Sequence, residues 1–174
     1  MLKLILKGFV ILLVVAVVAF ASAALVVPKK KSFTQETEIN VSRETVWKVL
    51  NDREKYTEWQ DQLTKVEIKD DKHWSETTVD GQILLFTLVS SEEPTGMRIS
   101  YNIGENFKGA WSGELRRVAP DKTIIRTTDS TEIDSVIMKV TVAIFFDIED
   151  FAKEWNQKLK KRAESLSDEG QADN

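Results

Sequence analysis

The chain opens on an uninterrupted apolar run. From Gly8 to Val27 no residue is charged, and Ser22 is the only polar side chain. A helix of about 20 residues at ~1.5 Å rise is about 30 Å long, which matches the hydrocarbon thickness of a bilayer. This pattern predicts that residues 1–28 form a single-pass membrane anchor, with the remaining domain on the extracytoplasmic side.

A cleaved signal peptide is the alternative reading of this segment. Lys3 and Lys7 form a basic start, and Ala21-Ser22-Ala23 offers the small-x-small pattern of a cleavage site. The apolar run continues beyond that site to Val27, which favours an uncleaved anchor. Residues 29–31 are three lysines, predicted to be a basic linker that could contact anionic headgroups.

The pattern of the next part, residues 32–166, indicates one folded domain. Phe33–Val41 alternates with period two and predicts a half-buried strand. Ser42 stands where an N-cap belongs, before apolar residues at helical spacing, and Arg53–Trp59 predicts a second short helical turn. Six further strands separated by turn signals follow: Leu63–Lys69, His73–Val79, Ile83–Ser90, Met97–Ile103, Ala110–Val118 and Thr123–Ile133.

The C-terminal part changes to a helical period. Apolar residues recur every three or four positions from Ile144 to Leu166 and predict one long amphipathic helix. Val136–Phe146 is apolar nearly all round and is expected to be a buried start of that helix or a loop folded over the sheet. Residues 167–174 are polar and acidic, typical of a disordered tail. The predicted fold is α+β, a curved antiparallel sheet wrapped around a long C-terminal helix with a cavity between them.

Two short motifs carry a resemblance to a known family. Glu38-Ile39-Asn40-Val41 precedes the helix around Val46-Trp47 and the turn Tyr56-Thr57-Glu58-Trp59, and Gly109-Ala110-Trp111 lies in a late strand. Residues 32–166 thereby resemble the START-like, helix-grip superfamily, in particular its polyketide cyclase/dehydrase-type (SRPBCC) proteins. The resemblance implies the helix-grip fold. The superfamily includes lipid carriers, hormone binders and aromatase/cyclases, so it does not select one function.

Charge and composition exclude several classes of function. Lys3 and Lys7 precede the apolar run, so the rest of the chain carries 22 Lys and Arg against 28 Asp and Glu. This net charge of −6 disfavours nucleic acid as a partner. With no cysteine and His73 as the only histidine, Cys–His catalysis is excluded, and no motif for a cofactor or metal occurs. We expect no cofactor and nominate no catalytic residue.

Aromatic side chains are the stronger candidates for a binding site. Trp59 ends the Tyr-x-x-Trp turn, which the resemblance places near the cavity mouth. Trp111 shares a strand face with Gly113, which leaves either a pocket or room for sheet curvature. The candidate cavity residues are Trp59, Phe86, Tyr101, Trp111, Met138, Val142 and Phe145.

Polar groups that could orient a ligand are fewer. Tyr101, Arg126 and Asp129 lie on predicted strands, but residues of this type usually face solvent. Arg126 and Asp129 are three positions apart, so they fall on opposite faces of their strand. We therefore expect a membrane-attached domain that binds a hydrophobic small molecule or lipid. The alternatives are a cyclase/dehydratase-like enzyme and a cavity-closed interaction module with an unknown protein partner.

Overall fold

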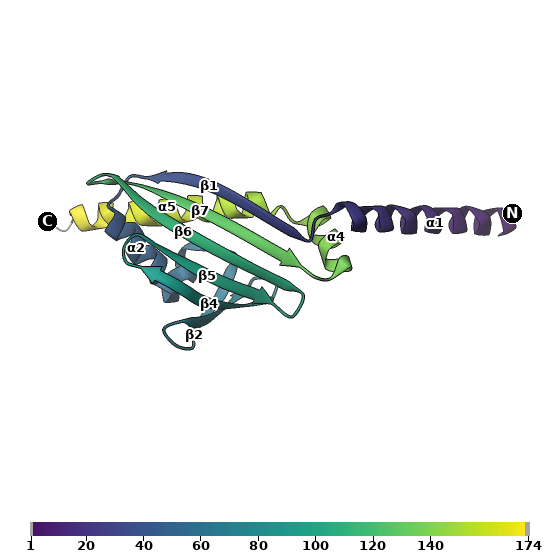
Figure 1. Ribbon diagram of the computed structural model, residues 1–174, viewed down its shortest axis with the longest axis horizontal. Coiled ribbons are helices and arrows are strands. Elements are labelled where there is room, and N and C mark those ends of the chain that lie inside the picture. Colours follow the sequence, from purple (N-terminus) through teal and green to yellow (C-terminus); the bar gives the residue numbers. More distant parts are fainter. Residues whose placement is uncertain (1, 173–174) are drawn as a thin grey trace.

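A computed structural model describes residues 2–172 (Figure 1). The helical elements are α1 (Leu2–Val26), α2 (Arg43–Asn51), the 3₁₀ turn η1 (Arg53–Lys55), α3 (Tyr56–Trp59), α4 (Val136–Phe145) and α5 (Ile148–Ala172). The strands are β1 (Lys30–Ile39), β2 (Leu63–Ile68), β3 (His73–Thr78), β4 (Ile83–Glu92), β5 (Gly96–Ile103), β6 (Phe107–Ala119) and β7 (Lys122–Ile133). The order of strands and short helices predicted for residues 33–133, followed by a long C-terminal helix, is confirmed.

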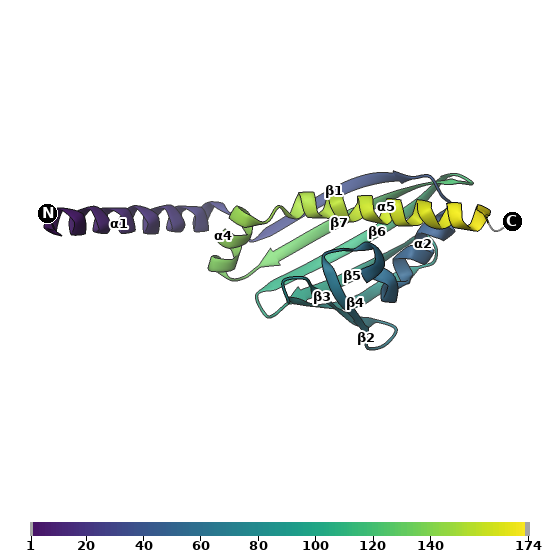
Figure 2. The ribbon, with the colours of Figure 1, turned by 180° about the vertical axis from the view of Figure 1, so that it is seen from behind.

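The strands form one antiparallel sheet in the order β1-β7-β6-β5-β4-β3-β2. Strands β2 to β7 follow one another as a meander, and β1 pairs with β7 along its whole length. Register shifts between Leu88 and Ser90 and between Arg117 and Ala119 increase the local twist. The sheet therefore curves, and α5 lies along one of its faces (Figure 2).

The first helix of the domain begins where the sequence predicts. The Ser42 side chain accepts a hydrogen bond from the Thr45 backbone N–H at 3.2 Å, as an N-cap should. The apolar side of α2 is buried, from Val46 to Leu50, and packs against α5. This contact fixes the C-terminal half of α5 to the strand–helix unit at the start of the domain.

The core lies between the concave face of the sheet and α5. Leu159 and Ala163 of α5 and Ile39 and Ile125 of the sheet have no exposed surface. Asn156 is also buried, and its side-chain amide donates to the hydroxyl oxygens of Thr37 at 3.3 Å and of Thr127 at 3.0 Å. These bonds satisfy polar groups that burial would otherwise penalise.

Three predicted boundaries differ from the structure. The lysine linker, residues 29–31, is partly strand, because β1 begins at Lys30. Helix α5 continues to Ala172, so residues 167–172 of the predicted disordered tail are helical, and 173–174 lie outside the described residues. The long helix begins at Ile148 rather than Ile144, since the chain is extended at Phe146.

Val136–Phe146 is neither a buried helix start nor a loop. It forms a separate helix, α4, which Ser135 caps by accepting a hydrogen bond from the Met138 N–H at 3.3 Å. Helix α4 packs against α1 and β7. Val140 is buried in this packing, whereas several other apolar side chains of α4 are exposed.

The N-terminal helix α1 projects from the domain, with its C-terminal end beside α4 (Figure 1). Among the described residues, no helix is long and apolar enough to cross a membrane. The predicted spanning helix is therefore not confirmed.

Candidate functional site

The concave face of the sheet is set by strand pairing. Trp111 of β6 lies opposite Asp129 of β7, and Asp129 lies opposite Phe33 of β1. Tyr101 of β5 lies opposite Gly109 of β6. Directly opposed residues share a face, so these side chains project to the same side as the core residues Ile99 and Ile125.

A row of aromatic rings crosses this face. The Trp74 and Phe86 rings stack with centroids 5.1 Å apart, and Phe86 lies 5.5 Å from Tyr101. Tyr101 in turn lies 6.3 Å from Phe107. Trp74 is buried, but the other three rings are half-buried. The row thus gives β3 to β6 a continuous apolar floor that remains partly accessible.

A second aromatic group joins this floor to α5. The Trp155 ring lies 5.6 Å from Trp59 of α3 and 5.7 Å from Trp111 of β6. The Tyr56 ring packs edge to face against Trp59 and Trp155, with ring centroids 5.3 Å and 6.5 Å apart, respectively. Aromatic pairs of this geometry each contribute about 1 kcal/mol beyond their buried area. Trp59 and Trp111 therefore help to hold α5 against the sheet.

The glycines on this face are covered by rings. A Cβ atom at Gly113 would overlap the ring of Trp111, and one at Gly109 would overlap the ring of Tyr101. The sequence left open whether Gly113 makes a pocket or permits curvature. The structure shows a third arrangement, in which the space above each glycine is filled by a neighbouring aromatic ring.

Gly113→Ala should displace the Trp111 ring and destabilise the domain by about 1–3 kcal/mol, the usual effect of overpacking. Urea denaturation would give the free energy of unfolding, and tryptophan fluorescence would report the ring's new surroundings. In a Trp111→Phe background the same alanine should cost much less, because the smaller ring reaches less far over the glycine. An equal cost in both backgrounds would contradict the contact.

Two polar groups face the aromatic floor. Asp129 is half-buried, and burial raises the pKa of its carboxyl to about 6. Burial, with a smaller contribution from the charge of Asp129, raises the pKa of Tyr101 above its usual range. In the described part of the chain we find no hydrogen-bond partner for either side chain. The expectation that these two groups face solvent is wrong, whereas Arg126 does lie on the exposed face.

A second carboxyl on this face was missed from the sequence. Glu76 of β3 is 8 % exposed and accepts a hydrogen bond from Trp74 Nε1 at 2.9 Å. Burial raises its pKa to about 7, although that hydrogen bond and the charge of Arg53 act in the opposite direction. The Arg53 guanidinium lies 4.3 Å above the centre of the Trp74 ring. The sequence does contain a signal for this position: Glu76 is two positions from Trp74 on one strand, so the two side chains lie on the same face of the sheet.

The two carboxyls do not form a pair. Strands β3 and β7 are four positions apart in the sheet, which corresponds to about 19 Å measured along it. Paired catalytic carboxyls of hydrolases lie about 5–10 Å apart. Any acid–base chemistry at this face would therefore use one carboxyl at a time.

The structure brings four of the seven predicted cavity residues together. Phe86 and Tyr101 belong to the aromatic floor, and Trp59 and Trp111 contact α5 through Trp155. Met138 and Val142 are half-buried on α4, and the side chain of Phe145 lies outside the described residues. The sequence analysis did not nominate three residues of this face: Phe33, Trp74 and Phe107.

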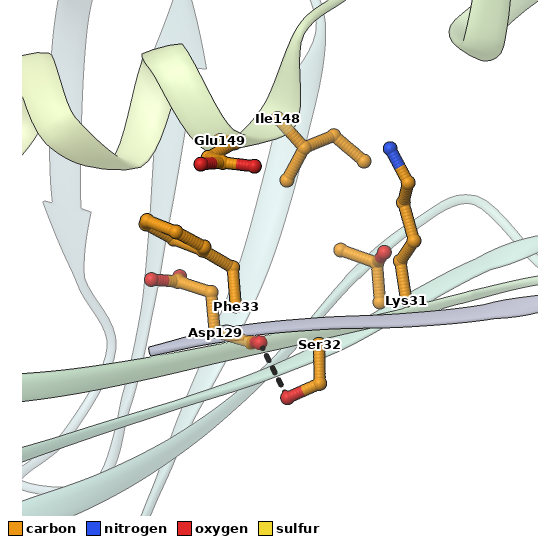
Figure 3. Close-up of a pocket in the computed structure, with 7 residues that line it drawn as sticks. Lys31, Ser32, Phe33, Asp129, Ile148 and Glu149 are labelled. Carbon is orange, nitrogen blue, oxygen red and sulfur yellow. Dashed lines mark hydrogen bonds between the residues drawn. The ribbon is translucent and has the colours of Figure 1, made fainter. Parts of the chain in front are cut away.

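The site is closed in this structure. The two best-formed pockets in the described part of the chain have volumes of about 70 and 60 Å³, whereas small-molecule sites measure about 300–1,000 Å³. The first pocket lies between the start of α5 and the paired strands β1 and β7 (Figure 3). Phe33 and Asp129 project toward Ile148 and Glu149 across it (Figure 3).

The histidine of the sequence lies on the other face of the sheet, because it precedes Trp74 by one position on β3. His73 is half exposed at the start of β3, with Nδ1 2.9 Å from the Asp70 carboxylate. Within residues 2–172, the described side chains include no group of three His, Asp or Glu placed to hold a metal ion. Asp147 accepts hydrogen bonds from the backbone N–H groups of Glu149 and Asp150, so it caps α5.

Comparison with known proteins identifies the family. Residues 30–167 match the family model described as polyketide cyclase / dehydrase and lipid transport. The chain belongs to this polyketide cyclase/dehydrase family. The helix-grip resemblance read from the sequence is thereby confirmed. A comparison with curated proteins gives no match.

Solved structures show the same fold at low identity. A START superfamily protein from Mycobacterium smegmatis is 15% identical, with a TM-score of 0.62 over 78% of this chain and 98% of that one. A conserved protein from Geobacillus kaustophilus is 12% identical, with a TM-score of 0.66 over 76% and 95%. Norcoclaurine synthase from Thalictrum flavum, a point mutant with a transition-state analogue, is 12% identical, with a TM-score of 0.64 over 79% and 96%. At these identities the likeness supports the family's helix-grip fold and no particular activity.

Proposed function

We propose that this domain binds a hydrophobic, lipid-like small molecule on the aromatic floor between the sheet and α5. The observation that carries the proposal is the half-buried row Phe86, Tyr101 and Phe107, with Asp129 on the same face. Apolar surface covered there gains about 25 cal/mol per Å² removed from water. The Asp129 carboxyl and the Tyr101 hydroxyl have no hydrogen-bond partner in the described chain and would bind the polar end of the ligand.

Binding requires the site to open, because its pockets are far smaller than a lipid. Helix α4 is the segment best suited to move. It connects β7 to α5, and apart from α1 its main partner is β7. Its displacement would allow the start of α5 to move away from β1 and β7 without exposing a buried charge, since Val140 is the buried side chain among the described ones of α4.

The proposal includes attachment of the domain to a membrane through α1. This rests on the sequence from Gly8 to Val27, which has no charged residue, and on the exposed apolar side chains of α1, such as Phe9 and Leu13. Water-exposed apolar surface of this extent marks a site of membrane or protein contact. An attached domain would remain close to a ligand that dissolves in lipid.

The test is native mass spectrometry of the full chain purified from membranes of its host. We expect the chain to remain in the membrane fraction after alkaline carbonate washing and to carry a discrete lipid-like mass. Asp129→Asn should reduce occupancy of that mass, whereas Arg126→Gln, three positions away on the opposite face, should not. A ligand-free mass that persists after incubation with host lipid extract would reject ligand binding and favour the interaction module.

Proton-transfer catalysis is a second candidate function, favoured by the pKa of Asp129. A carboxyl whose pKa is about 6 exchanges protons readily near neutral pH, which suits a general acid or base. Its position on the same face as the Tyr101 ring would place it against a substrate bound on the aromatic floor. Conversion of the co-purified molecule by the wild-type chain, lost in Asp129→Asn, would distinguish an enzyme from a carrier.

A further inference from the structure

The outward face of α4 is unusually apolar for a helix in contact with water. Ile137 is 69% exposed, Ile144 65% and Val136 49%. Phe146, directly after the helix, is 50% exposed, and its ring lies 5.6 Å from that of Phe151 at the start of α5. Together these five side chains form what we call the α4 patch.

The composition of α4 explains why this surface is not an ordinary solvent face. Lys139 and Thr141 are its only polar residues among ten. Met138 and Val142 are half-buried on one side of the helix, and on the opposite side Val140 is buried among the exposed Val136, Ile137 and Ile144. A helix that is apolar nearly all round is found in a protein core or in lipid. The chain covers Val140 but leaves the apolar side chains around it exposed, so a second apolar environment is expected at that side of α4.

The surroundings of the patch indicate a lipid surface as the occupant. Helix α4 packs against α1 at the point where α1 leaves the domain (Figures 1 and 2). Both helices carry exposed apolar side chains, so the α4 patch and the apolar surface of α1 meet at this corner. A membrane that receives α1 would therefore meet α4 next. A separate protein partner would have to share this corner with the lipid around α1.

Two lysines near the patch are paired with acidic side chains. Lys29 lies 3.1 Å from Glu132 and 2.6 Å from Asp134, and Lys30 lies 3.1 Å from Glu132. Two of the three lysines of the basic linker predicted to contact anionic headgroups are thus already paired with acids of the domain. Attraction to anionic lipid through these lysines is weakened, and the apolar contact must dominate.

We propose that the α4 patch docks on the surface of the lipid bilayer and turns the closed site toward it. This inference rests on the proposed membrane attachment and adds the orientation of the domain. The pocket of Figure 3 adjoins the same corner, since Thr131 and Ile148 flank the β7–α4–α5 connection. A lipid-soluble ligand would then pass between bilayer and site beside α4 without crossing water.

The chain has no cysteine, so single-cysteine labelling of the full chain tests this directly. Ile144→Cys and the control Val89→Cys are labelled with an environment-sensitive fluorophore and placed in phosphatidylcholine nanodiscs. Val89 is equally apolar and 62% exposed, but it lies on β4. The label at position 144 should shift its emission to the blue and lose most of its intensity to brominated lipid, whereas the label at 89 should not.

The outcomes separate the two proposals. If the chain enters nanodiscs but both labels behave alike, the docking inference is rejected and membrane attachment stands. If the chain does not enter nanodiscs at all, both are rejected. A blue shift at position 144 in lipid-free buffer that grows with protein concentration would assign the patch to a second copy of the chain instead. Quenching that appears only after phosphatidylserine is added would replace apolar docking with charge attraction.

Discussion

Leu159→Ala should lower the free energy of unfolding by about 3 kcal/mol, one of the largest effects expected of any single change in this domain. Leu159 lies in the middle of α5, has no exposed surface and belongs to the main core cluster with Ile39 and Ile125. Truncation removes apolar contacts and leaves a cavity that a helix fixed at several points cannot fill by moving. Those fixed points are the packing of α5 on α2, α3 and β1.

The matched control is Leu85→Ala on β4. Leu85 is 42% exposed, so the same truncation should cost less than about 1 kcal/mol. Both variants can be measured by urea denaturation of a chain that begins at Lys29, because all residues of the core cluster lie between Ile39 and Ala163. Equal losses for the two variants would mean that α5 does not close the core.

Much of the fold could be predicted because its signals are local. A strand of period two followed by Ser42 and a helical spacing defines the start of the domain, and the N-cap hydrogen bond confirms that reading. Turn residues such as Asp80-Gly81 separate the strands, and Gly81 has the positive φ of 82° that such a turn requires. The single long apolar stripe on α5 then leaves one arrangement, a helix on a curved sheet.

The candidate site was harder to predict because it depends on register. Sequence parity shows that Arg126 and Asp129 face opposite ways, but not which of them faces inward. Pairing of Asp129 with Trp111 and Phe33 decides this, and those contacts join residues far apart in the sequence. The same applies to Gly109, since the ring that covers it comes from the neighbouring strand.

The prediction for the α4 segment was wrong for a different reason. An apolar run longer than a strand is usually a buried helix, so Val136–Phe146 was expected in the core or over the sheet. The core volume is already occupied by α5, whose Leu159 and Ala163 fill the concave face. The run therefore folds as a helix at the edge of the domain, where α1 provides part of its packing surface.

Burial of Glu76 should make the domain less stable as the pH rises. The ordinary pKa of 4.5 is raised to about 7 in the folded protein, so the folded state binds more protons than the unfolded chain between these values. The contribution of Glu76 to stability is therefore most favourable at low pH and decreases as the pH rises through that window. A shift of this size corresponds to about 3 kcal/mol.

Glu76→Gln removes this ionisation but keeps an acceptor for Trp74 Nε1. We expect the free energy of unfolding of the variant, relative to wild type, to rise by about 3 kcal/mol from about pH 4 to about pH 8. The pKa of Asp129 is also raised, but Asp129 is present in both proteins, so its contribution to the pH dependence cancels in the comparison. Glu67→Gln on the exposed side of β2 controls for the loss of one negative charge. Parallel pH profiles for wild type and Glu76→Gln would show that the Glu76 carboxyl ionises as freely in the folded domain as in the unfolded chain.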